Sequence, residues 1–165
     1  LDWVAMQDAA DRLRERGLNV TAQRLAVLRA VECCPHAPAE RVAEFVRAEL
    51  GTVSRQAVYD ALASLTEGGL IRRLQPAGAP ALFDPRVGDG HHHAICRQCG
   101  AVADIEPSVG AAPVLSPTTD CGYAIEASEV LYWGLCPSCR PRRVPRSARN
   151  QQSRTTKPST PRSAR

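Results

Sequence analysis

Four of the seven cysteines form two Cys-x-x-Cys pairs, and this spacing constrains the fold of the chain more than any other feature: Cys96 with Cys99, and Cys136 with Cys139. Two intervening residues allow both thiolates of a pair to reach one ion, and Gly100 permits a tight turn after the first pair. Four thiolates match the closed tetrahedral shell of structural Zn²⁺. We therefore predict a structural zinc site at the ends of a small β unit, with a redox-active disulfide pair as the alternative.

The cysteine pairs enclose a unit of about fifty residues, which is too small to hold a stable core without a metal or a partner. Short apolar and β-branched runs in this unit predict strands. The strands cover residues 94–96, 102–105, 123–127 and 130–135, and a Pro-, Gly-, Ser- and Thr-rich connection covers 107–120. We expect a small α/β domain with an antiparallel sheet at residues 87–140.

Residues 1–86 show the pattern of short helices followed by a hairpin. Thr21 and Ser54 are suitable N-caps of the second and fourth helices, and Pro38 suits the first turn of the third. The expected helices cover residues 5–17, 21–34, 38–51 and 54–68, and short strands follow at 70–74 and 81–83. A small helical bundle is the alternative, but a hairpin directly after the last helix favours a winged helix-turn-helix. The predicted fold class is α+β.

The fourth helix and the hairpin carry the candidate DNA-binding residues. Arg55, Gln56 and Tyr59 lie near the N-terminal end of the helix, where side chains meet base edges in a major groove. Arg72 and Arg73 lie on the wing, where they would contact phosphates, which position the protein without specifying sequence. A solvated strand edge is the alternative interpretation of these two arginines.

A second candidate metal site uses histidine and aspartate. All four histidines of the chain are candidates: His36, His91, His92 and His93. On an extended strand, His91 and His93 point to one side and His92 to the other. Asp84 at the exit of the wing and Asp104 inside an apolar strand are the nearby carboxylates. Three imidazoles and two carboxylates suit Fe²⁺ or Mn²⁺ and also accept Zn²⁺ or Ni²⁺.

Charge is distributed unevenly along the chain. The formal net charge is +4, but residues 140–165 carry nine Lys/Arg and no acid, which leaves 12 basic and 17 acidic residues in 1–139, a net of −5. We predict that residues 141–165 form a basic disordered tail with salt-sensitive attraction for DNA. An inert solubilising tail is the alternative.

The order of several motifs resembles the ferric uptake regulator (Fur) superfamily over about residues 5–139. The motifs are Thr21-Ala22-Gln23-Arg24, Ala57-Val58-Tyr59, Glu67-Gly68-Gly69-Leu70-Ile71 and the run from His91 to Gly100. The resemblance implies a homodimeric, metal-activated repressor that binds an inverted-repeat operator in double-stranded DNA. It also implies an N-terminal winged-helix domain and a C-terminal α/β dimerisation domain.

The resemblance assigns roles to particular residues. It implies structural zinc at the four cysteines named above and a regulatory ion, Fe²⁺ or Mn²⁺, at His36, Asp84, His91, His93 and Asp104. Asp84 stands where iron-uptake regulators usually have Glu, and Asp is the choice of the peroxide-sensing branch. Residues 129–134 look like the actinobacterial group that represses a catalase-peroxidase gene. Asp60 replaces the usual arginine of the recognition helix, which suggests a different operator.

We therefore expect a peroxide-responsive repressor, with an iron-, zinc- or nickel-responsive uptake regulator as the alternative. The expected sensing event is oxidation of His36 or His91 beside bound Fe²⁺. Thiol oxidation at the zinc site or at the remaining cysteines, Cys33, Cys34 and Cys121, is a variant of this hypothesis. We interpret Cys33 and Cys34 as small buried helix residues instead.

Two other classes of protein are disfavoured. The sequence has no H-E-x-x-H, no G-x-S-x-G and no nucleotide-binding loop, so we expect neither an enzyme nor a small-molecule substrate. It also has no run of 18 apolar residues and no signal-peptide pattern, so we expect a cytoplasmic protein with no membrane partner.

Overall fold

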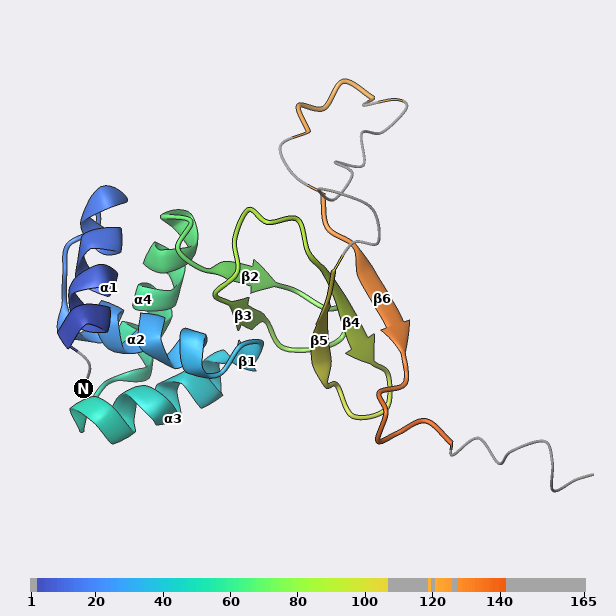
Figure 1. Ribbon diagram of the computed structural model, residues 1–165, viewed down its shortest axis with the longest axis horizontal. Helices are drawn as coiled ribbons and strands as arrows, with labels where there is room; N and C mark the ends of the chain where they lie inside the picture. Colours follow the sequence, from blue (N-terminus) through green and yellow to red (C-terminus); the bar gives the residue numbers. More distant parts are fainter. Residues whose placement is uncertain (1–2, 107–118, 120, 126–127, 142–165) are drawn as a thin grey trace, which may run out of the picture.

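The computed structural model describes residues 3–106, 119, 121–125 and 128–141, and its elements fall into two groups (Figure 1). The first group is α1 (Trp3–Glu15), α2 (Ala22–Cys33), β1 (Ala37–Pro38), α3 (Ala39–Leu50), α4 (Arg55–Glu67), β2 (Arg72–Leu74) and β3 (Leu82–Asp84). The second group is β4 (His92–Cys96), β5 (Val102–Ile105) and β6 (Leu131–Gly134).

Local capping signals set the helix boundaries. The Thr21 side chain accepts a hydrogen bond from the Arg24 amide at 3.2 Å, and Ser54 accepts one from the Ala57 amide at 3.1 Å. Both predicted N-caps are confirmed. Pro38 lies at the N-cap of α3 in extended conformation rather than in its first turn, because it also belongs to strand β1.

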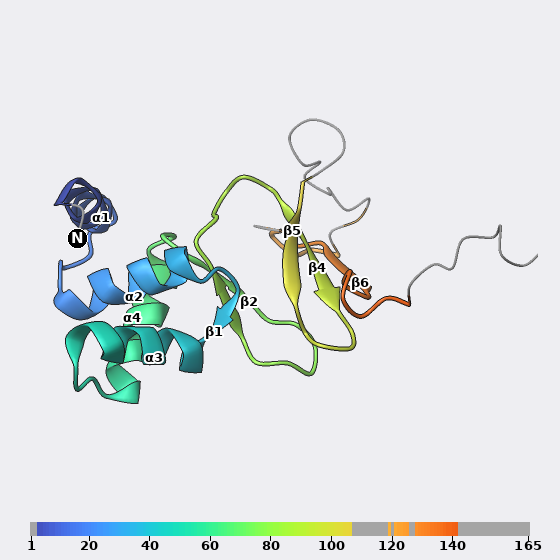
Figure 2. The same ribbon diagram turned by 60° about the horizontal axis from the view of Figure 1, so that its bottom comes forward.

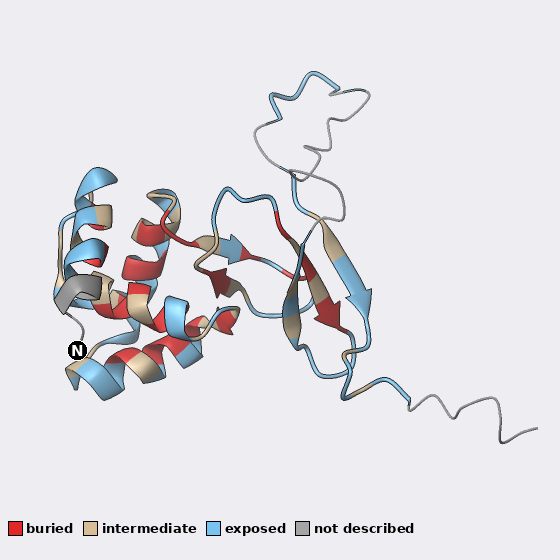
Figure 3. Cartoon of the chain, viewed as in Figure 1, coloured by how far each residue is buried: buried red, intermediate tan, exposed pale blue. Residues whose placement is uncertain are grey.

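The hydrophobic core belongs to the first group. The inward faces of α2, α3 and α4 are buried (Figure 3), and Leu28, Val46 and Leu65 have no exposed surface. Burial of these aliphatic side chains is the main force that holds the helices together. Among the described residues, the core cluster runs from Ala9 to Phe83 and includes no residue of the second group.

The wing is a three-stranded antiparallel sheet in the order β1-β3-β2. Sequence analysis missed β1, which pairs Ala37 with Phe83. The His36 amide donates to the Phe83 carbonyl at 2.8 Å, and His36 has a φ of 61°, a left-handed conformation that histidine tolerates better than most residues. This sheet lies between the helices and the second sheet in both views (Figures 1 and 2).

The second sheet has the order β5-β4-β6, and it is mixed rather than antiparallel throughout. Strand β5 is antiparallel to β4, but β6 is parallel to it. A parallel neighbour needs a long crossover, and residues 106–130 are long enough to provide one. The predicted strand at 123–127 is wrong for residues 123–125, which are not strand; β6 occupies the free edge of β4. Residues 126–127 lie outside the described residues.

The α+β class is confirmed, with a winged helix-turn-helix followed by a small sheet that carries the four cysteines. The predicted connection at 107–120 lies outside the described residues except for residue 119, and so does the predicted tail beyond residue 141. Within the described residues, every helix is too short or too polar to span a membrane.

Candidate metal centres and DNA-binding surface

The four predicted zinc ligands converge at the end of the second sheet. Their Sγ atoms all lie within 4.8 Å of one another. Cys99 Sγ and Cys136 Sγ are 3.7 Å apart. Thiolates bonded at about 2.3 Å to one tetrahedral ion lie about 3.8 Å apart, whereas a disulfide needs about 2.05 Å. The donor set therefore fits zinc, and the geometry disfavours the disulfide alternative.

Backbone amides and neighbouring thiols shift the pKa values of Cys96 and Cys139 in opposite directions. Hydrogen bonds from the backbones of Cys136, Cys99 and Gln98 lower the pKa of Cys96 to about 6, against the effect of its burial. The Cys136 amide lies 3.4 Å from Cys96 Sγ. Hydrogen bonds with Cys136 and Cys99 raise the pKa of Cys139 to about 12. The lowered pKa favours a thiolate at Cys96, and an ion bound by all four cysteines would displace the thiol protons that remain.

The histidine and aspartate cluster lies between the wing and the second sheet. His36, just before β1, and Asp84, the last residue of β3, come from the wing. His91, just before β4, with His93 on β4 and Asp104 on β5, come from the second sheet. Asp84, His91 and His93 are almost fully buried. The structure thus brings all five predicted ligands together from two parts of the fold.

The spacing of the five donor atoms suits one ion. His91 Nε2 lies 2.9 Å from Asp84 Oδ2 and 3.0 Å from His93 Nε2. His93 Nε2 lies 3.1 Å from Asp84 Oδ2, and His36 Nε2 lies 2.9 Å from Asp104 Oδ1. Ligands at right angles around an ion with bonds of about 2.1 Å lie about 3.0 Å apart. Four of the five donors, all except His91, lie within 4.8 Å of one another, and His91 joins them through Asp84 and His93.

Among the described residues, two donor atoms of the cluster lack a hydrogen-bond partner. In the described part of the chain, His36 Nε2 and Asp104 Oδ1 are buried and lack a hydrogen bond of acceptable geometry, although they face each other. A buried polar atom without a partner costs about 1–3 kcal/mol. A divalent ion between them would satisfy both. Three imidazole nitrogens and two carboxylate oxygens fit Fe²⁺, Mn²⁺ or Zn²⁺.

Electrostatics keep Asp84 charged. Burial disfavours its anion most strongly, yet the contacts with His36, His93 and His91 and the hydrogen bond from the Arg86 amide together outweigh burial and lower the pKa of Asp84 well below its ordinary value. The interaction with Asp84 is in turn the main reason that the pKa of His36 is raised, against the effect of burial. Without an ion, the protonated form of His36 is therefore favoured beside the buried carboxylate.

Asp89 is a functional residue that sequence reasoning missed. Asp89 Oδ1 lies 2.5 Å from His91 Nδ1. Burial opposes its charge, but hydrogen bonds from His91 and Arg86 lower the pKa of Asp89 to about 2, so Asp89 accepts and His91 Nδ1 donates. This tautomer leaves Nε2 free to bind an ion. The sequence signal is the Asp89-Gly90-His91 spacing of an Asx turn, in which Asp89 Oδ1 also accepts from the His91 amide at 3.3 Å.

The predicted base-reading residues lie on the surface of α4, where each contacts an acidic side chain. Gln56 Nε2 donates to Asp60 Oδ1 at 2.7 Å, and the Tyr59 hydroxyl donates to Glu40 Oε1 at 2.9 Å. The Arg55 guanidinium is exposed and lies 3.5 Å from the same Glu40 oxygen. A role for these side chains in reading DNA stays a prediction.

The two wing arginines have different surroundings. Arg73 Nη2 donates to Gln75 Oε1 at 2.9 Å on the exposed wing. Arg72 points to the second group, where its guanidinium lies 3.9 Å from Glu129. Its predicted contact with phosphate is untested, and the pairing with Glu129 favours an interdomain role.

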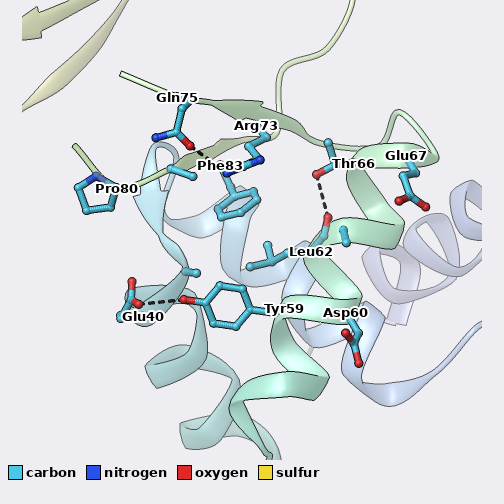
Figure 4. Close-up of a pocket in the computed structure, with 13 residues that line it drawn as sticks. Glu40, Tyr59, Asp60, Leu62, Thr66, Glu67, Arg73, Gln75, Pro80 and Phe83 are labelled. Atoms are coloured by element: carbon cyan, nitrogen blue, oxygen red, sulfur yellow. Dashed lines mark hydrogen bonds between the residues drawn. The ribbon is translucent and has the colours of Figure 1, made fainter. Parts of the chain in front are cut away.

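A pocket of about 640 Å³ lies between α4 and the wing (Figure 4). Leu62 and Phe83 form part of its apolar lining. Its charged lining residues are Glu40, Asp60, Glu67 and Arg73. Three acids and one base give phosphates little attraction here, so contact of this face with DNA would depend on shape and on individual contacts more than on overall charge.

A winged helix that shares a ligand cluster with its second domain is a DNA-binding protein that a metal ion can regulate. Residues 15–112 match the family described as "Ferric uptake regulator family". "Transcriptional regulator FurA" of Mycobacterium tuberculosis is 49% identical over 135 residues, which cover 82% of this chain and 92% of that protein. The chain belongs to the ferric uptake regulator family. It is a metal-responsive transcriptional regulator and not an enzyme.

More distant relatives agree with this assignment. "Peroxide operon regulator" of Bacillus subtilis is 28% identical over 136 residues, which cover 81% of this chain and 92% of that protein. The ferric uptake regulator of Helicobacter pylori has the same fold, with a TM-score of 0.63 and 16% identity over 84% of this chain and 96% of that one. The Helicobacter pylori protein is described with three functional metal binding sites, and the ferric uptake regulator of Vibrio cholerae is described with DNA-binding domains.

Proposed function

We propose that this chain is a peroxide-responsive repressor whose regulatory ion is held jointly by a winged-helix domain (residues 1–86) and a dimerisation domain (residues 87–140). The convergence of five nitrogen and oxygen donors from both sheets carries the proposal. The ion is Fe²⁺ or Mn²⁺, and the four cysteines hold a structural Zn²⁺. We place the protein in the cytoplasm, where it would act on oxidative-stress genes such as that of a catalase-peroxidase.

The position of the ligands explains how an ion would control DNA binding. His36 and Asp84 belong to the DNA-binding domain, whereas the other three ligands belong to the dimerisation domain. One ion bound by both sets fixes the angle between the domains. In a two-fold dimer, this angle sets the separation of the two α4 helices and hence their fit to the half-sites of an inverted repeat. The ion favours the DNA-competent state by its higher affinity for that state.

Exposed apolar residues support a homodimer. Most of the exposed large hydrophobic side chains among the described residues lie beyond residue 86: Val87, Ile105, Tyr123, Ile125, Tyr132, Trp133 and Leu135. Ile105 pairs with His92 and Tyr132 with Ala94, so both lie on the sheet face opposite His93. Exposed apolar side chains that share one face of a small sheet are typical of a protein-protein interface. We assign it to the second copy of the chain.

The proposed DNA contact of Arg55 predicts a salt-dependent effect. The Arg55→Met variant should bind operator DNA more weakly, and the slope of log affinity against log salt should fall by about 1, because one cation fewer then displaces counterions from the duplex. Arg14, which pairs with Asp11 on α1, provides the matched Arg14→Met control. Fluorescence anisotropy at several salt concentrations measures both. An unchanged slope in the Arg55 variant would remove this residue from the interface.

Peroxide sensing follows from the nature of the ligands. Fe²⁺, when bound, activates peroxide beside the imidazoles. His36 and His91 each present a ring carbon next to the ligating nitrogen, and oxidation at this carbon weakens the ring as a ligand. The net change oxidises the imidazole by two electrons: one peroxide oxygen is added to the ring and the other leaves as water. The altered ring of His36 or His91 would hold the ion less tightly, and without the ion the domains would lose the arrangement that fits DNA.

The test is mass spectrometry and DNA binding after peroxide treatment. We expect the Fe²⁺-loaded protein to gain one oxygen on the peptide that carries His36 or His91 and to release its own upstream DNA. The Mn²⁺-loaded protein is the control, and it should stay unmodified and bound. Release of DNA without added oxygen on either peptide would contradict histidine oxidation.

Thiol oxidation is the competing route to the same response. The expectation that Cys33 is buried is wrong: it is exposed, because it is the last residue of α2 and faces away from the core, whereas Cys34 is half-buried. Cys121 is exposed as well. Zinc release and loss of DNA binding in peroxide without iron would identify this route.

An iron-responsive uptake regulator without peroxide sensing is the second candidate function. The family description and the 49% identity to FurA favour it, because the relative named for peroxide is only 28% identical. DNA binding that follows Fe²⁺ concentration and survives peroxide would support this function over the first.

A further inference from the structure

Arg86 lies on the segment that joins β3 to β4 and contacts four carboxylates around the regulatory site. Its backbone amide donates to Asp84 Oδ1 at 2.9 Å. Its guanidinium donates to Asp89 Oδ2 at 2.7 Å, to Asp104 Oδ2 at 3.0 Å and to Glu106 Oε1 at 2.8 Å. No motif in the sequence marks this residue.

These contacts leave one oxygen of each ligating carboxylate free. Arg86 binds Oδ1 of Asp84 and Oδ2 of Asp104, so that Asp84 Oδ2 and Asp104 Oδ1 face the imidazoles. Each carboxylate can then give only one oxygen to an ion. Bidentate coordination by these carboxylates, which Ca²⁺ often uses to reach six to eight oxygen ligands, is disfavoured by this arrangement.

Arg86 also acts on a third ligand through Asp89. Asp89 accepts from Arg86 with one oxygen and from His91 Nδ1 with the other. The guanidinium thus fixes the carboxylate that orients the His91 ring. The planar fork of arginine can serve several carboxylates at once, which the single ammonium of lysine cannot do in the same geometry.

We propose that Arg86 is the positioning residue of the regulatory site: its guanidinium holds Asp104 and, through Asp89, His91 in the arrangement that one divalent ion requires. The contact with Asp84 comes from its backbone amide, which the substitutions below keep. This inference rests on the regulatory site proposed above. Within that site, Arg86 sets the affinity for the ion and its coordination geometry.

The positive charge of Arg86 lies beside a site for a positive ion, and by itself this charge would weaken binding of the ion. If Arg86 acted only through its charge, its removal would strengthen metal binding. Glu106, which is mostly exposed, contacts the Arg86 guanidinium, and its negative charge offsets much of the positive charge of Arg86. We therefore expect positioning to prevail, with a loss of affinity of about 10- to 100-fold, as is usual for residues that orient metal ligands.

The experiment measures binding of Co²⁺ to the zinc-loaded full chain by its visible absorption, which reports coordination geometry. The variants are Arg86→Met and Arg86→Lys, with Arg14→Met as the control and His91→Ala as the reference for a lost ligand. We expect both Arg86 variants to bind about 10- to 100-fold more weakly. The Arg86→Lys variant keeps the charge, so a changed spectrum in that variant reports lost positioning.

The outcomes separate this inference from the site itself. Weaker binding and an altered spectrum in Arg86→Lys, with Arg14→Met unchanged, support the positioning role. Unchanged or tighter binding in both Arg86 variants, with weaker binding in His91→Ala, overturns the role of Arg86 alone. Unchanged binding in His91→Ala overturns the proposed site. If Arg86→Met does not fold, Arg86→Lys decides the result by the same criteria.

Discussion

Replacement of Cys96 by serine is expected to unfold the dimerisation domain while the winged helix stays folded. The described core cluster ends at Phe83, and beyond it the buried apolar residues are Ile95 and Cys96. In the part of this unit that the structure describes, two buried apolar side chains offset little of the conformational entropy that is lost when its strands are ordered, at about 1–2 kcal/mol per residue. Structural zinc supplies about 10–16 kcal/mol in small zinc domains, and its loss should therefore be decisive.

Amide hydrogen exchange distinguishes the two domains in this experiment. In the Cys96→Ser variant, amides of β4, β5 and β6 should lose protection, whereas those of α2 and α4 should keep it. Cys121→Ser is the matched control, because Cys121 is exposed and lies outside the four-cysteine cluster. Prolonged chelation of the unaltered protein should reproduce the result. Protected β4 amides in a zinc-free Cys96→Ser sample would show that the domain does not depend on the metal.

The features that were predictable from sequence are those with local causes. Thr21 and Ser54 cap helices through hydrogen bonds that reach only three residues along the chain. The alternation of His91, His92 and His93 follows from strand geometry, and the burial of His91 and His93 beside a half-exposed His92 confirms it. Fixed spacing likewise made the cysteine pairs recognisable as a metal-binding pattern.

The features that were missed depend on contacts between distant segments. Strand β1 exists because Ala37 pairs with Phe83, a partner 46 residues away, and nothing in its two residues marks a strand. The parallel register of β6 likewise depends on its long crossover. Arg86 is an ordinary surface arginine by sequence, and its role emerges only when the fold brings Asp104 and Glu106 beside it.

Replacement of His93 by alanine is expected to abolish metal-dependent DNA binding. His93 is buried, and its Nε2 contacts both Asp84 of the wing and His91 of its own domain, so it lies at the point where the two halves of the site meet. Loss of a residue that only orients a ligand weakens metal binding by about 10- to 100-fold, and removal of a direct ligand should weaken it by more than that. At a metal concentration that saturates the unaltered protein, the variant should behave as the chelated protein does.

The neighbouring histidine supplies the control for this experiment. His92 lies on the same strand but on the opposite face, where its Nδ1 lies 3.4 Å from the Tyr132 hydroxyl and no metal-ligand cluster includes it in the described residues. His92→Ala should therefore bind the metal as the unaltered protein does, and a loss of DNA binding in this variant at unchanged metal affinity would report the dimer face on which His92 lies. Anisotropy titrations with upstream DNA, over a range of free Mn²⁺, compare the two variants. Tight DNA binding by His93→Ala, or by the unaltered protein after chelation, would mean that the ion does not set the spacing of the recognition helices, because a ligand shifts an equilibrium only by its differential affinity.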